Sequence, residues 1–178
     1  SNLPIDLYKN HTALSKPGPR LRELSKKIKE TIPIHQNGGL DILHELSTRI
    51  LESIKYSKGK TDINTTAEIA MEIGAGVCQD HTHAFITSAR LLGFSSRYVS
   101  GYLSNGINET QVATHAWAEV YIMGLGWVGF DISNGISPDE RYVRLATGFD
   151  YADVIPISGV RIGNGEEQIK TEITFNQQ

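Results

Sequence analysis

The sequence feature that most constrains the fold is the separation of helical from strand-like patterns along the chain. Residues 21–32 and 40–54 carry apolar residues three to four positions apart, as amphipathic helices do. From residue 96 onward the pattern changes to segments rich in Tyr and Val, which are typical of strands. Helices followed by strands favour an α+β fold over a doubly wound parallel sheet, so we expect N-terminal helices packed on an antiparallel β-sheet.

Two more helices are predicted in the middle of the chain. Thr65 followed by Glu68 is a capping-box pattern, which predicts a short helix over residues 66–73 that ends at Gly74. Helical spacing of apolar residues resumes after Cys78 and stops at Gly93, which suits a helix C-terminus. The one cysteine of the chain is therefore expected at the N-terminus of a buried helix.

Strands are predicted over residues 96–103, 110–122 and 127–132, with a hairpin at Gly124 and Gly126. Residues 169–175 alternate apolar and polar side chains, as a half-buried strand does. We expect a single domain over residues 1–178, the usual size of one domain. Its expected parts are a helical region 1–60, a catalytic core 61–148 and C-terminal strands 149–178.

Composition limits the classes of partner. Seventeen Lys and Arg against twenty Asp and Glu give a net charge of −3, whereas binding to a nucleic-acid backbone needs a basic excess. No segment approaches the roughly 20 consecutive apolar residues of a membrane-spanning helix. We therefore expect neither nucleic acid nor membrane as a partner. One cysteine cannot form a disulfide within the chain, which fits a reducing compartment, and we expect a cytoplasmic location.

The surroundings of Cys78 favour a reactive thiol over a small buried apolar side chain, the common role of a lone cysteine. A helix N-terminus favours the thiolate because its backbone N–H groups are unpaired. The small residues at positions 74–76 leave room for a substrate carbonyl. Backbone N–H groups beside the sulfur, at Val77 and Gln79, are candidates for an oxyanion hole.

His115 is the histidine best placed to act as base for such a thiol. Strand alternation puts it on one face with Trp117, a candidate supporting residue. If the hairpin closes around residues 123–125 in the register that we expect, Asp131 lies directly opposite His115. The carboxylate would then bind one ring nitrogen and leave the other for the thiol.

Other interpretations of the histidines are weaker. Cys78, Asp80, His81 and His83 resemble a metal site by residue type, but positions 81 and 83 point about 200° apart on a helix. His81 could act as a local base, although the helix N-terminus disfavours an imidazolium there. For His83 and His44 we expect packing or polar positions on helices.

Three segments resemble the bacterial transglutaminase-like superfamily, whose members include proteins of the cysteine-protease type. They are GVCQDH at residues 76–81, THAWAE at 114–119 and GWVGFD at 126–131; residues 97–102 and 151–154 are similar too. The resemblance covers residues 56–175 and implies a papain-like core with Cys78 as nucleophile, His115 as general base and Asp131 as orienting acid. Members usually carry an N-terminal β-rich region as well, so we expect this chain to be a fragment of a longer protein and that region to be a partner of it.

The residues together predict acyl transfer at amide bonds of a protein or peptide substrate, through a thioester and without metal or cofactor. Water as acceptor makes a cysteine peptidase or amidase, the function we expect, and a primary amine makes a cross-linking transglutaminase. A binding or scaffold module that keeps the fold is the alternative of another class.

Overall fold

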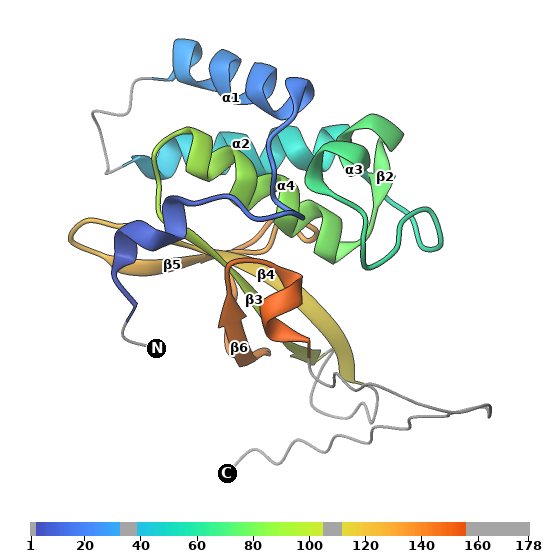
Figure 1. The fold of residues 1–178 in the computed structure, drawn as a ribbon. Helices are drawn as coiled ribbons and strands as arrows, with labels where there is room; N and C mark the ends of the chain where they lie inside the picture. The colour runs from blue at the N-terminus through green and yellow to red at the C-terminus, as the bar shows by residue number, and fades with distance from the viewer. Residues whose placement is uncertain (1–2, 33–38, 105–111, 156–178) are drawn as a thin grey trace.

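The computed structural model describes residues 3–32, 39–104 and 112–155. Helices form one layer and an antiparallel sheet lies beneath them (Figure 1). The helices in the described part of the chain are η1 (Ile5–Lys9), α1 (Pro19–Thr31), α2 (Leu40–Ser53), α3 (Ala67–Ile73), α4 (Cys78–Leu91) and η3 (Tyr151–Val154). The strands there are β1 (Lys55–Tyr56), β2 (Ala75–Gly76), β3 (Ser96–Ser104), β4 (Val112–Ile122), β5 (Gly126–Phe130) and β6 (Tyr142–Gly148).

The main sheet has the strand order β5-β4-β3-β6, and each neighbouring pair is antiparallel. The two-residue strands β1 and β2 form a separate parallel pair. These features confirm the predicted α+β class with helices packed on an antiparallel sheet. Strand β6 was not predicted, and the strand predicted at residues 169–175 lies outside the described residues.

Helix α4 is the centre of the core. It packs against β3 and β4 on one side and against α1, α2 and α3 on the other, so residues all around it are buried, among them Phe85 and Ile86. The small side chains of Ala116 and Ala118 on β4 belong to the same core. Burying a side chain such as Phe85 contributes roughly 2–3 kcal/mol, and this packing fixes the position of Cys78 at the start of α4.

The predicted capping box at Thr65 and Glu68 is wrong in its partners. The cap of α3 is Thr66, whose hydroxyl accepts a hydrogen bond from the backbone N–H of Ile69 at 3.3 Å. The Glu68 carboxylate instead accepts from the backbone of Arg20 at 2.8 Å and of Leu21 at 3.2 Å. Glu68 therefore caps α1, whose unpaired N–H groups attract an anion.

Buried Arg90 ties the N-terminal segment to the sheet. Its guanidinium donates hydrogen bonds to the carbonyls of Tyr8 (3.0 Å), Ser96 (2.9 Å) and Phe149 (2.7 Å) and to the hydroxyl of Ser15 (2.8 Å). Burial outweighs the attraction of nearby carboxylates and lowers the pKa of Arg90 to about 10. The side chain still carries its charge at pH 7, and it donates to backbone oxygens and to the Ser15 hydroxyl.

No helix in the described ranges is both long and apolar enough to span a membrane.

Candidate active site

Cys78 occupies the predicted place, the first residue of α4, and is partly buried. The start of α4 depends on Gly76, because a Cβ there would lie 2.6 Å from the Asp80 side chain. Asp80 folds back in this way to accept a hydrogen bond from the backbone N–H of Val77 at 2.7 Å. Helix packing and this cap together hold the thiol at the edge of the core.

The backbone N–H groups at the start of α4 differ in their availability. The first helical hydrogen bonds run from Asp80 and His81 to the carbonyl of Val77, so the N–H groups of Cys78 and Gln79 precede them. Val77 donates its own N–H to Asp80, which removes it from the predicted oxyanion donors. The side chain of Gln79 reaches the carbonyls of residues 62 and 63 at 3.5 Å, so it lies along that loop.

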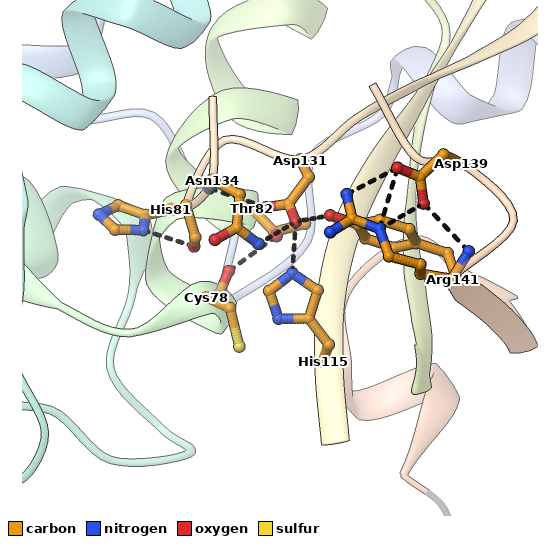
Figure 2. Close-up of polar contacts among 10 residues, drawn as sticks. Cys78, His81, Thr82, His115, Asp131, Asn134, Asp139 and Arg141 are labelled. Atoms are coloured by element: carbon orange, nitrogen blue, oxygen red, sulfur yellow. Dashed lines mark hydrogen bonds and ion pairs between the residues drawn. The ribbon is translucent and has the colours of Figure 1, made fainter. Parts of the chain in front are cut away.

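His115 and Asp131 are joined by a hydrogen bond, with 2.6 Å between His115 Nε2 and Asp131 Oδ2. Figure 2 shows His115 between Cys78 and Asp131, with its second ring nitrogen turned toward the sulfur. The predicted register is wrong by two residues, however, because Phe130 pairs with Ala118 and not with Ala116. Asp131 therefore reaches His115 diagonally across the two strands.

Charge and burial set the protonation of this pair. Burial of His115 favours the neutral ring, but the hydrogen bond to Asp131 and the interaction with Cys78 outweigh it and raise the pKa to about 9. Burial of Asp131 favours its neutral form, yet hydrogen bonds from His115, Tyr142 and Asn134 lower its pKa. At pH 7 the site holds an imidazolium, which is the partner that stabilises a thiolate.

Two residues that sequence reasoning missed also bind Asp131. Asn134 donates its backbone N–H to Oδ1 at 3.2 Å and its side-chain amide to Oδ2 at 2.7 Å. Tyr142 donates its hydroxyl to Oδ2 at 2.6 Å. Asn134, three residues after an aspartate, carries the signal of a local Asx-type turn. Nothing in the sequence pairs Tyr142 with the site, because β6 was not predicted.

Trp117 lies beside His115 and is almost fully buried. Its ring lies 6.4 Å from the His115 ring in a nearly parallel arrangement, and only 2% of Trp117 is exposed. The ring of Tyr142 meets Trp117 edge-on at 5.4 Å and lies 6.0 Å from His115. These aromatic rings form a wall beside the imidazole.

Three other histidines of the described part of the chain have structural partners. His81 uses both ring nitrogens, one with the Ser133 hydroxyl and one with the Ile54 carbonyl, each at 2.8 Å. His83 is buried, and its Nε2 accepts from the backbone of Tyr151 at 3.2 Å. His44 packs against the ring of Phe130 at 5.3 Å. Within the described ranges no group of three or more His, Cys, Asp and Glu side chains could hold a metal ion.

Tyr56 is a further residue near the thiol that the sequence did not single out. Strand β1 runs beside β2, and the backbone N–H of Ser57 donates to Gly76 at 2.7 Å. This pairing brings Tyr56 next to Cys78, where partial burial and the charge of Cys78 raise the pKa of the phenol. Tyr56 is 53% exposed, so its ring lies where a bound substrate could contact it.

Comparison with known proteins places this geometry in context. A family model described as the transglutaminase-like superfamily matches residues 25–132, which include Cys78, His115 and Asp131. The uncharacterized protein Rv2569c of Mycobacterium tuberculosis is 34% identical over 144 residues. The match covers 73% of this chain and 45% of that protein, so the chain spans less than half the length of this relative.

Two solved structures share the fold. A candidate cysteine protease from Cytophaga hutchinsonii has a TM-score of 0.65 at 26% identity, covering 86% of this chain and 50% of that chain. The periplasmic domain of TgpA from Pseudomonas aeruginosa has a TM-score of 0.56 at 18% identity, covering 72% of this chain and 46% of that chain. At the latter identity the likeness shows the fold alone.

Proposed function

The chain belongs to the transglutaminase-like superfamily, whose members are typically cysteine-dependent, and we propose that it hydrolyses amide bonds of a protein or peptide substrate through a thioester on Cys78. In this proposal Cys78 is the nucleophile, His115 the general acid and base, and Asp131 the residue that orients the imidazole. The reaction class is acyl transfer, with water as the acceptor.

Each step follows from the positions of the three side chains. The Cys78 thiolate attacks the amide carbonyl carbon, and the N–H groups of Cys78 and Gln79 at the start of α4 face the oxygen that gains the charge. His115 gives its ring proton to the leaving amine, and a thioester remains. Water then attacks the thioester and gives a proton to His115, which releases the acid and restores the thiolate–imidazolium pair.

The observation that carries this proposal is the 2.6 Å bond between His115 Nε2 and Asp131 Oδ2 beside the partly buried thiol. The bond holds one ring nitrogen on the carboxylate and leaves the other for the sulfur. A module that only binds would not need a histidine whose pKa is raised to about 9 next to its one cysteine. The arrangement therefore favours an enzyme over a scaffold.

The acceptor separates a peptidase from a transglutaminase, and one experiment decides it. Glutamine-containing peptides are incubated with the protein and a primary amine, and the products are identified by mass spectrometry. Cleaved peptide is the result we expect, because water is the acceptor in this proposal. An amine adduct with release of ammonia would make the protein a transglutaminase. Neither product, in a protein whose thiol also reacts as an isolated thiol, would favour a binding module.

A further inference from the structure

Tyr142 connects two edges of the sheet at the candidate site. It is the first residue of β6, whereas Asp131 directly follows β5, and β4 and β3 lie between these two strands. The Tyr142 hydroxyl nevertheless donates to Asp131 Oδ2 at 2.6 Å. The hydroxyl therefore acts on the carboxylate from a strand that carries none of the three proposed catalytic residues.

The backbone around Gly101 makes this reach feasible. The pairing of β3 with β6 shifts register between Ser100 and Gly101. A Cβ on Gly101 would lie 2.1 Å from the carbonyl oxygen of Val143 and 2.6 Å from the Trp117 ring. A glycine is needed here because the indole and the β6 backbone both press against β3. This close packing sets Trp117 against the ring of Tyr142.

The carboxylate oxygen that faces His115 is shared among three donors. Asp131 Oδ2 accepts from His115 Nε2, from the side-chain amide of Asn134 and from the Tyr142 hydroxyl, at 2.6, 2.7 and 2.6 Å. Burial and the bond to Asp131 raise the pKa of Tyr142 above its usual range, so the phenol keeps its proton and stays a donor. Each neutral donor takes up part of the negative charge that would otherwise hold the imidazolium proton.

We infer that Tyr142 is a positioning residue of the proposed reaction: its hydroxyl holds Asp131 against His115 and shares the carboxylate's charge, so that His115 can release its proton to the leaving amine. The inference rests on the proposed function. Other titratable and charged groups near this pair also affect the titration of His115. Cys78 and His81 lie on α4, Tyr142 begins β6, and Arg141, just before β6, acts on Tyr142.

The variant Tyr142→Phe tests the inference because it removes the hydroxyl and keeps the ring. With one donor fewer, Asp131 attracts the imidazolium more strongly, so the midpoint of His115 should rise by about half a pH unit. NMR of ring-labelled histidine measures this midpoint, with the His115 signal assigned from its loss in His115→Ala. Asn134→Ala removes another donor to the same oxygen and should shift the midpoint in the same direction. Amide hydrolysis should slow several-fold in both.

Tyr121→Phe is the matched control, because Tyr121 lies on the same sheet with its ring against Trp127. In this variant the midpoint of the His115 titration should equal that of the wild type. A wild-type His115 that titrates near the ordinary value of about 6.5 overturns the proposed function and this inference with it. A wild-type midpoint near 9 that Tyr142→Phe leaves unchanged overturns the inference alone, even if the variant unfolds at a lower temperature.

Discussion

His115 Nε2 lies 2.6 Å from Asp131 Oδ2, and the carboxylate side chain has no exposed surface. A fully buried carboxylate keeps its charge only if hydrogen bonds replace the lost water. Asp131 has them from His115, Asn134 and Tyr142. The pair is thus a fixed acceptor and a fixed imidazolium, and the thiol of Cys78 lies beside the second ring nitrogen (Figure 2).

Asp131→Asn should lower the rate of amide hydrolysis by about 100-fold or more while the protein stays folded. An amide has nearly the same shape as a carboxylate but lacks the charge that supports the imidazolium, and general acid–base catalysis contributes about 10²–10⁴ in rate. The measurement is turnover of a peptide substrate, with circular dichroism to check the fold. Asp139→Asn is the matched control, because Asp139 lies in the same loop and its carboxylate pairs with exposed Arg141. Equal rates in the two variants would contradict the role of Asp131.

Gly101→Ala should destabilise the protein by about 1–3 kcal/mol or more, since the added methyl group would meet the backbone oxygen of Val143 at 2.1 Å. Gly129→Ala is a milder comparison, because there the nearest atom to the methyl group would be in the Pro138 ring, at 2.9 Å, and not in the backbone. Urea denaturation of both variants gives the two losses. A smaller loss at Gly101 than at Gly129 would show that β3, β6 and Trp117 are packed less closely than described.

His83 should make the fold sensitive to acid. Burial, helped by the charge of Arg90, lowers its pKa from 6.5 to about 4, so below pH 6.5 the unfolded chain binds a proton that the folded protein does not. Stability is therefore lost as the pH falls from 6.5 toward 4, by up to about 3 kcal/mol. His83→Leu should flatten this dependence in urea denaturation at several pH values. His44→Leu, at an exposed histidine of α2, is the control, and an unchanged slope in His83→Leu would refute the prediction.

Much of the candidate site could be predicted because its determinants are local. Cys78 at a helix start follows from the glycines before it and the apolar spacing after it, and the alternation of β4 puts His115 and Trp117 on one face. The hairpin between β4 and β5 was also predictable. Its register was not, because the loop is centred on Gly124, which has a φ of 86°, and one different turn residue moves every pair.

The remaining features depend on contacts between distant segments. Glu68 caps α1 across 47 residues of sequence, and no local pattern distinguishes that role from a cap on its own helix. Tyr142 reaches the site because β6 pairs with β3, and this pairing joins segments that are far apart in the sequence. The domain limits stay predictions.

The most direct test of the central claim is the pH dependence of iodoacetamide alkylation at Cys78, which mass spectrometry follows cleanly because the chain has one cysteine. Because the imidazolium of His115, which is protonated up to about pH 9, favours a thiolate beside it, the rate constant of the wild type should depend less on pH between 6 and 8.5 than that of the variant His115→Ala. In His115→Ala the rate constant should fall by roughly 10-fold or more as the pH is lowered from 8.5 to 6, as for an isolated thiol with a pKa of about 8.5. Wild type and variant falling together, each like an isolated thiol, would contradict the claim that Cys78 and His115 form a catalytic pair.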